Sequence, residues 1–159
     1  MHRFAQAALA ALVLLLAAAL PAQAALPKNS VWKEYTIDSL DGTNLNVDVF
    51  RHKDAPADAR QPVIMVVSPY TVPEGALPSS RFNDFVDQAK ILDRGYTYVI
   101  VTMRSFGKSE GCSDWGGPGE QMDTVAGVQW AARQPWSNGR VGLYGKSYDG
   151  WTGLMGIAN

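Results

Sequence analysis

The sequence predicts an α/β fold in which an antiparallel hairpin precedes a mostly parallel sheet with crossover helices. Three observations carry this prediction: alternating apolar and polar residues between positions 31 and 50, continuous apolar runs at 63–67 and 98–102, and segments of helical period after these runs. Alternation marks strands with one polar face, whereas continuous apolar runs mark strands that are buried on both faces. Strands that alternate with helices predict parallel pairing through crossover connections.

The expected elements follow one another along the whole chain after residue 30. The turn signal Asp41-Gly42 separates two strands of the hairpin, and a polar surface loop, 51–61, leads to the first buried strand. Proline or glycine marks the end of most later segments. The expected strands are 31–37, 45–50, 63–67, 98–102 and 140–144, and the expected helices are 82–95 (capped by Ser79 or Ser80 and closed by Gly95), 120–134 (with Met122, Val125, Ala126 and Trp130 toward the core) and 147–158.

Composition limits the class of protein. The chain has 159 residues, of which 47% are hydrophobic and 18% are charged, so one domain with a buried core is expected. The formal net charge is −1 at pH 7, without a run of Lys or Arg. Nucleic-acid binding normally requires a clustered basic surface, so no nucleic-acid partner is expected. The sequence specifies no oligomeric state.

The first residues have the pattern of an export signal. A short basic start at Arg3 precedes the apolar stretch 7–20, Pro21 breaks it, and small residues at 22 and 24 form a cleavage pattern. We therefore expect a signal peptide at 1–24, a mature chain of 25–159, and a secreted or periplasmic location. The apolar stretch is shorter than the roughly 20 residues that span a bilayer, so no stable membrane anchor is expected.

The chemistry of the sequence centres on Ser147. It lies in the segment Gly145-Lys146-Ser147-Tyr148-Asp149-Gly150, between an expected strand and an expected helix. A serine at such a turn can act as an exposed nucleophile, with glycines on either side that let neighbouring backbone pass. The second glycine is at 150, one position later than in the strict Gly-x-Ser-x-Gly pattern. The alternative interpretation is that Ser147 only caps the helix.

A phosphate-binding loop is a rival interpretation of this segment. Gly145-Lys146-Ser147 would end a phosphate-binding loop only if glycine stood at position 140, and Arg140 stands there. A nucleophilic serine also needs a base and an orienting acid. The two histidines of the chain are His2, in the expected signal, and His52, in a polar segment where a surface histidine is expected. Asp149 is the one acid that follows Ser147, so the chain does not contain the acid and histidine that follow the serine in an α/β-hydrolase.

From about residue 41 onward the chain resembles the amino-terminal part of the Xaa-Pro dipeptidyl-peptidase and cocaine-esterase family of α/β-hydrolases. The resemblance is carried by an ordered set of motifs rather than by one of them. These are the opening hairpin 41–49, Ser68-Pro69-Tyr70, the arginine–glycine loop 104–111, the lead-in 134–142, and GKSYDG at 145–150, which matches the family's G-x-S-Y-x-G form. Thr102 and Ser105 depart from the aspartate and glycine that the family often carries beside the arginine.

The resemblance implies roles for individual residues. Ser147 would be the acylated nucleophile, and the hydroxyl of Tyr70 and the backbone N–H of Tyr148 would hold the oxyanion. Gly145 and Gly150 would form the turn. For Arg104 itself, a surface or structural ion pair is expected rather than a role in catalysis. No metal or organic cofactor is implied. The family's catalytic acid and histidine would lie beyond Asn159.

The sequence therefore supports a serine hydrolase that cleaves a small peptide or ester through an acyl-enzyme, with this chain as a fragment that is inactive alone. The peptidase and the cocaine or α-amino-acid ester type of esterase stay open as substrate classes. A non-catalytic, hydrolase-like remnant that binds a ligand or partner is the alternative. The single cysteine, Cys112, either lacks a partner in an oxidising compartment or is a small buried thiol.

Overall fold

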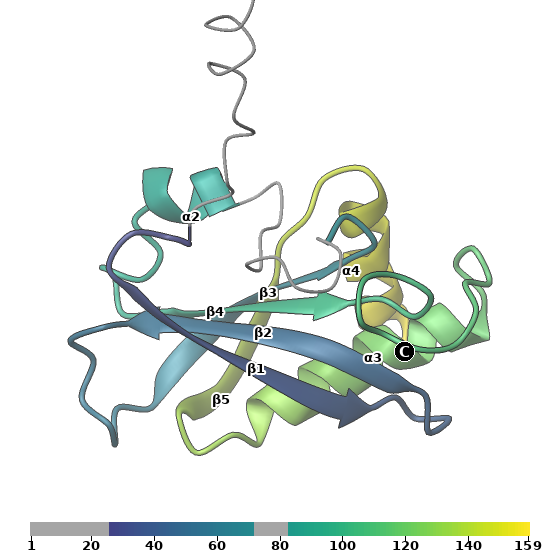
Figure 1. Cartoon of the computed structure of the whole chain (residues 1–159), viewed down its shortest axis with the longest axis horizontal. Helices are drawn as coiled ribbons and strands as arrows, with labels where there is room; N and C mark the ends of the chain where they lie inside the picture. Colours follow the sequence, from purple (N-terminus) through teal and green to yellow (C-terminus); the bar gives the residue numbers. More distant parts are fainter. Residues whose placement is uncertain (1–25, 72–82) are drawn as a thin grey trace, which may run out of the picture.

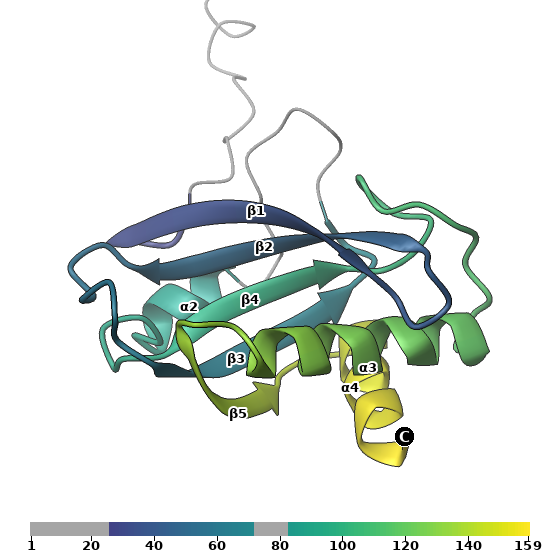
Figure 2. The ribbon, with the colours of Figure 1, turned by 90° about the horizontal axis from the view of Figure 1, so that it is seen from below.

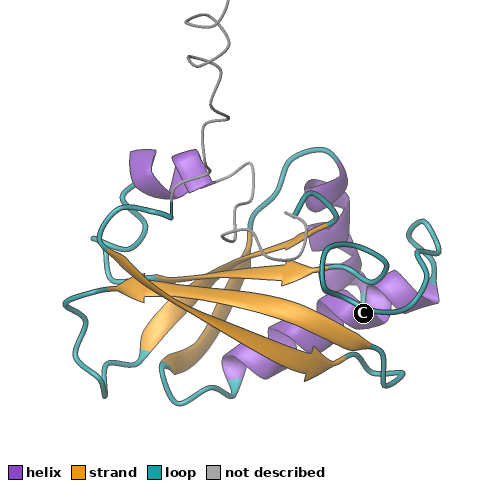
Figure 3. Ribbon diagram, in the orientation of Figure 1, coloured by secondary structure: helices purple, strands orange, loops and turns teal. Residues whose placement is uncertain are grey.

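The computed structural model describes residues 26–71 and 83–159 as one twisted sheet with helices packed on it (Figures 1 and 3). The order of elements agrees with the expected hairpin followed by alternating strands and helices. The elements are β1 (Ser30–Asp38), β2 (Asn44–His52), β3 (Gln61–Ser68), α2 (Asn83–Gln88), β4 (Thr97–Thr102), α3 (Pro118–Ala132), β5 (Ser137–Leu143) and α4 (Tyr148–Ala158).

The five strands form one sheet in the order β1-β2-β4-β3-β5. β1 pairs with β2, and β2 with β4, in antiparallel register, whereas β4, β3 and β5 run parallel to one another. Met65 at the centre of β3 lies between Val99 of β4 and Leu143 of β5. The mixed sheet confirms the predicted hairpin followed by parallel units.

Each face of the sheet is covered by apolar packing. On one face, alternate residues such as Val47, Met65 and Val101 pack with Ala131 and Trp136, from the end of α3 and just after it. On the other face, Val66 and Ile100 pack with Val86 of α2. Figure 2 shows α3 and α4 together on one side of the sheet and α2 on the other. This arrangement confirms the predicted crossover helices and places helices on both faces of the sheet.

The helix expected at 82–95 is shorter than the prediction. α2 ends at Gln88, and the chain continues in turns to Gly95, with Lys90 at a positive φ of 52°. A residue in that left-handed conformation ends an α-helix. The apolar residues Ile91 and Leu92 are still buried, because the turns bring them back to the sheet. Ser79, Ser80 and Phe82 lie outside the described residues.

The face of the hairpin that was expected to be polar and wet is largely covered on β2. Asn46 is 8% exposed and Asp48 is 5% exposed. The loop that follows β4 crosses this region, where Ser109 Oγ accepts a hydrogen bond from the Asn46 backbone N–H at 2.9 Å. Asp48 instead accepts a hydrogen bond from the indole N–H of Trp32 at 2.8 Å. The alternation predicted the strand correctly but not the loop that covers it.

The core-facing side of α3 also differs from the prediction. Ala126 is buried as expected, but Met122, Val125 and Trp130 are only partly buried. The buried positions of this helix include two acids, Glu120 and Asp123, that interact with groups outside the helix. Apolar periodicity therefore located α3 without identifying the side chains that it buries.

The expected signal peptide at 1–24 lies outside the described residues and stays a prediction. Over residues 26–71 and 83–159, no helix is both long enough and apolar enough to cross a bilayer.

Asp48 provides a test of the covered hairpin. Burial first, and then the charge of Glu34 directly opposite on β1, raise the pKa of its carboxyl from 3.8 to about 6, against the lowering effect of the Trp32 hydrogen bond. The protonated carboxyl of Asp48 therefore makes its full contribution to stability below pH 4, and this contribution is lost as the pH rises through about 6. Asp48→Asn keeps an acceptor for Trp32 and should raise the free energy of unfolding at pH 7 by about 1–2 kcal/mol.

Urea unfolding at pH 4 and pH 7 measures this effect. Asp38→Asn, at an exposed position of the same hairpin, controls for the loss of one negative charge. Equal stability changes for Asp48→Asn at both pH values would contradict the expected linkage.

Candidate active site

The carboxyl ends of the three parallel strands bring the predicted site residues to one edge of the sheet. Tyr70 follows the end of β3, Arg104 the end of β4, and Ser147 the end of β5. β3 and β5 are adjacent, and the backbone N–H of Tyr144 donates to the Met65 carbonyl at 2.8 Å. Because ligands of such sheets bind beyond the carboxyl ends of the strands, this edge is the candidate site.

Ser147 has the backbone of a strained turn between strand and helix. Its φ is 60° and its ψ is −126°, a conformation that costs a non-glycine residue about 1–3 kcal/mol. It occupies the N-cap position of α4, where its carbonyl accepts from the N–H groups of Gly150 and Trp151 at 3.0 and 3.1 Å. Its side chain makes no capping hydrogen bond and the residue is exposed. The hydroxyl is therefore not used as a helix cap, which removes the main support for the capping alternative.

Gly145 allows the turn to close. A Cβ at this position would lie 2.1 Å from the carbonyl oxygen of Asp149 and 2.7 Å from the nitrogen of Gly150. A Cβ at Gly150 would lie 3.3 Å from the Gly145 carbonyl oxygen. The two glycines thus face each other across the turn. Asp149, at the position where the strict pattern has glycine, is buried, with 1% exposed.

α4 is fixed closely to the sheet and to α3. The hydroxyl of Thr152 donates to the carbonyl of Val67 at 2.7 Å, which joins the helix to β3. A Cβ at Gly156 would lie 2.8 Å from Thr124 Cγ2 and 2.9 Å from Leu143 Cδ1. The glycine at 156 therefore permits close packing of α4 against both α3 and β5.

Tyr70 and Tyr148 lie near each other beside this turn. Tyr70 is 42% exposed, and its backbone N–H donates to Ser68 Oγ at 3.0 Å. The Tyr148 hydroxyl donates to Glu120 Oε2 at 2.5 Å. Burial raises the pKa of Tyr148 above its ordinary value, and the hydrogen bond to Glu120 and the nearby Asp114 and Tyr70 raise it further. The phenol of Tyr148 therefore stays protonated and donates.

Arg104 makes a buried structural ion pair, as expected. Its Nη2 lies 2.7 Å from Asp123 Oδ1 and its Nη1 lies 2.9 Å from Asp41 Oδ2. The Arg104 hydrogen bond is the main cause that lowers the pKa of Asp41 to about 2, and the Asp123 hydrogen bond raises the pKa of Arg104. A Cβ at Gly119 would lie 2.3 Å from Nη1, so a side chain there would displace the guanidinium from this position. The guanidinium joins the β1–β2 turn to α3 and is not directed at Ser147.

Sequence reasoning missed Glu120. Its side chain is fully buried, and its carboxylate accepts hydrogen bonds from the hydroxyl of Tyr148, the residue after the candidate nucleophile, and from the loop that precedes α3. Asp114 of that loop caps the helix by accepting from the backbone N–H of Gly119 at 2.7 Å. The sequence did contain a signal for it. Glu120 and Asp123 are three residues apart and therefore share one face of the helix, and because the opposite face also carries polar residues, one of the two polar faces must be buried.

His52 does not belong to this site. It ends β2, and the pairing of Phe50 with Tyr98 places it near the amino end of β4, opposite the edge that carries Ser147. Its Nε2 lies 3.3 Å from Asp93 Oδ1. Within the described residues, no three His, Cys, Asp or Glu side chains form a group that could hold a metal ion. The described part of the chain thus offers Ser147 no histidine base.

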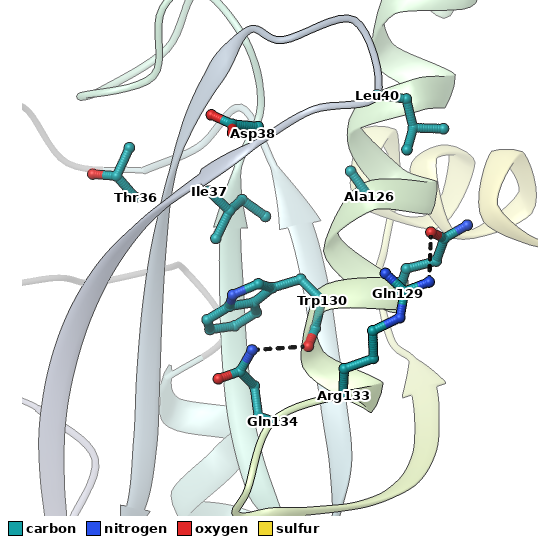
Figure 4. A pocket seen from close by; sticks show the side chains of 9 residues that line it. All are labelled: Thr36, Ile37, Asp38, Leu40, Ala126, Gln129, Trp130, Arg133 and Gln134. Carbon is teal, nitrogen blue, oxygen red and sulfur yellow. Dashed lines mark hydrogen bonds between the residues drawn. The ribbon is translucent and has the colours of Figure 1, made fainter.

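A hollow of about 470 Å³ lies between the end of β1 and the carboxyl-terminal half of α3 (Figure 4). Ile37, Ala126 and Trp130 are among its apolar lining residues, and Arg133 lies at its side. Ser147, Tyr70 and Tyr148 do not line it, so it is separate from the candidate site.

Cys112 is exposed, so the interpretation as a small buried thiol is wrong, and no disulfide joins it to another described residue.

Comparison with known proteins identifies relatives of the chain. The family described as X-Pro dipeptidyl-peptidase (S15 family) matches residues 41–159. The putative Xaa-Pro dipeptidyl-peptidase of Streptomyces avermitilis is 29% identical over 162 residues, which cover 82% of this chain and 24% of that protein. The cocaine esterase of Rhodococcus sp. is 31% identical over 126 residues, which cover 77% of this chain and 20% of that protein.

A solved structure agrees with these relatives. A CocE/NonD family hydrolase from Staphylococcus aureus matches with a TM-score of 0.65 and 25% identity, over 81% of this chain and 25% of that chain. The likeness confirms the predicted α/β-hydrolase fold. The chain spans between a fifth and a quarter of the length of these relatives.

The glycine pair of the turn provides a test of its geometry. Gly145→Ala places a methyl group against the backbone of residues 149 and 150, which cannot rotate away, and should lower the free energy of unfolding by about 3 kcal/mol. Gly150→Ala is the matched control, because its methyl group has more room and alanine favours a helix by roughly 1 kcal/mol over glycine. Urea unfolding compares the two variants. Equal losses for both would show that the turn is not packed as described.

Proposed function

Because the chain belongs to the X-Pro dipeptidyl-peptidase (S15) family of hydrolases, we propose that it carries the nucleophile of a serine hydrolase that cleaves after proline in small peptides. The observation that carries the proposal is Ser147: a strained, exposed serine between β5 and α4 whose hydroxyl does not cap the helix. A strained conformation persists only where the surrounding structure maintains it, and such residues cluster at active sites.

The proposed reaction proceeds through an acyl-enzyme. Ser147 Oγ attacks the carbonyl carbon of the scissile bond and its proton passes to a base, while the carbonyl oxygen becomes an oxyanion. The Tyr70 hydroxyl and the Tyr148 backbone N–H donate to that oxyanion. The amine leaves with a proton from the base, and water then hydrolyses the ester on Ser147. This mechanism needs no metal or organic cofactor.

The base is a separate part of the proposal. His52 lies at the opposite edge of the sheet, and the chain spans about a quarter of the length of its relatives. We propose that a histidine and an acid from a longer polypeptide complete the site, and that this chain alone is inactive.

Processing after Ala24, with export of the mature protein, also belongs to the proposal and is checked by sequencing the mature amino terminus.

Labelling by a fluorophosphonate probe tests the nucleophile in the full-length protein that contains this chain. The probe should label the wild type and should not label Ser147→Ala, because only an activated serine reacts with it. Ser109→Ala, a serine whose hydroxyl donates to the Thr102 carbonyl, is the control and should be labelled like the wild type. Persistent labelling of Ser147→Ala would assign the nucleophile to another residue. An unlabelled full-length wild type would favour a non-catalytic binding protein.

An esterase is the second candidate, because the cocaine esterase of Rhodococcus sp. is similar over 77% of the chain. Ala-Pro-p-nitroanilide and p-nitrophenyl esters distinguish the two classes, by kcat/KM measured for the same full-length preparation. We expect kcat/KM for the prolyl anilide to exceed that for the corresponding alanyl anilide at least roughly tenfold, as expected of a pocket that recognises proline. Ester cleavage without cleavage of either anilide would favour the esterase.

A further inference from the structure

The carboxylate of Glu120 is buried at the first turn of α3 and accepts four hydrogen bonds. Oε1 accepts from the Ser113 hydroxyl at 2.5 Å and from the Trp115 backbone N–H at 3.2 Å. Oε2 accepts from the Gly116 backbone N–H at 2.7 Å and from the Tyr148 hydroxyl at 2.5 Å. The side chain is fully buried. One carboxylate therefore joins the loop before α3 to the residue that follows Ser147.

All four partners of Glu120 are donors, and this limits what can replace it. A carboxylate presents two acceptor oxygens and no hydrogen, so both of its ends suit these partners. In either orientation a glutamine would direct its NH₂ group at one hydroxyl, which can accept, and at one backbone N–H, which cannot. An aspartate is shorter by one methylene group. The length and the two acceptor oxygens of a glutamate side chain thus suit this position.

The ring of Tyr148 contacts two tryptophan rings, in addition to the hydrogen bond at its hydroxyl. Its centroid lies 6.3 Å from that of Trp115 and 5.1 Å from that of Trp151, both edge to face. Gly116 lies against Trp151, since a Cβ there would be 2.4 Å from the indole. Trp115 and Gly116 both have positive φ, of 52° and 83°. The left-handed conformation is unfavourable for Trp115 but not for Gly116, and the hydrogen bonds to Glu120 hold both residues in place.

We propose that Glu120 is a positioning residue, which fixes the Ser147–Tyr148 peptide through the Tyr148 hydroxyl and so aims the Tyr148 N–H at the oxyanion. The inference rests on the proposed function. A hydrogen-bond donor stabilises a transition state only when it already points to the position of the developing charge. Small displacements of such groups lower rates strongly, because the donor cannot reorient without cost.

Steady-state kinetics on p-nitrophenyl acetate, whose acyl group is too small to depend on a substrate pocket, test the proposal in the full-length protein. We expect Glu120→Gln to lower kcat roughly ten- to hundredfold with little change in KM. Tyr148→Phe removes the hydroxyl that Glu120 holds and should cause a similar loss. Because the two changes break the same connection, the double variant should be no slower than the slower single variant.

Two further variants set the scale. Glu110→Gln changes an exposed carboxylate that accepts from the side-chain amide of Asn44, and it should keep the wild-type kcat. Tyr70→Phe removes the other proposed oxyanion donor, and it shows the loss expected when a donor is absent rather than misplaced. Urea unfolding of each variant separates a loss of fold from a loss of rate.

The possible results separate the positioning role from the proposed function. A wild-type kcat in Tyr148→Phe, or additive losses in the double variant, would overturn the positioning role. If labelling still depends on Ser147, the proposed serine hydrolase would stand. A less stable Glu120→Gln variant with wild-type kcat would make Glu120 structural only. Absence of Ser147-dependent labelling in the full-length wild type would overturn both. If Glu120→Gln does not fold, the kcat of Tyr148→Phe alone decides the question.

Discussion

The guanidinium of Arg104 is buried among three segments that are distant in sequence: the turn after β1, the loop after β4 and the first turns of α3. Asp123 and Asp41 neutralise its charge, and the Asp123 carboxylate also accepts from the Arg104 backbone N–H at 3.1 Å. A buried charge is tolerated only when it is paired and hydrogen-bonded, so loss of Arg104 would leave the buried carboxylate of Asp123 uncompensated. The ion pair sets the position of α3, and Glu120, one turn before Asp123, is thereby placed against Tyr148.

The turn at Ser147 is supported by the contact between Glu120 and Tyr148 and by close backbone packing around Gly145. Gly145 lets residues 149 and 150 approach, and Thr152 ties the helix to Val67 of β3. These contacts supply the free energy that offsets the strained backbone of Ser147. The reactive group is thus held by its neighbours, whereas its own hydroxyl is free of a capping role. Strain and exposure at a single serine are the properties that a nucleophile at this edge requires.

The succession of strands and helices along the chain, the turn at 41–42 and the nucleophile turn could all be predicted from the sequence, because each depends on local patterns. Apolar runs identified β3 and β4, and the glycines around Ser147 identified the turn before α4. Contacts between residues distant in the sequence could not be predicted from it. The loop after β4 covers Asn46, turns end α2 at Gln88, and Glu120 is buried by partners from a loop and from α4. The residue pattern of one helix or strand does not show which residues of other elements it will contact.

The place of β4 in the sheet has a kinetic consequence. β2 and β3 follow one another along the chain, yet each pairs with β4, which begins only at Thr97. Until β4 inserts, the hairpin and β3 share no ladder of hydrogen bonds, and closing these long connections slows folding. A growing chain would therefore expose two unpaired apolar strand edges before residue 97 is made. Such edges pair readily with other chains, so synthesis through this interval is the stage at which aggregation competes most strongly with folding.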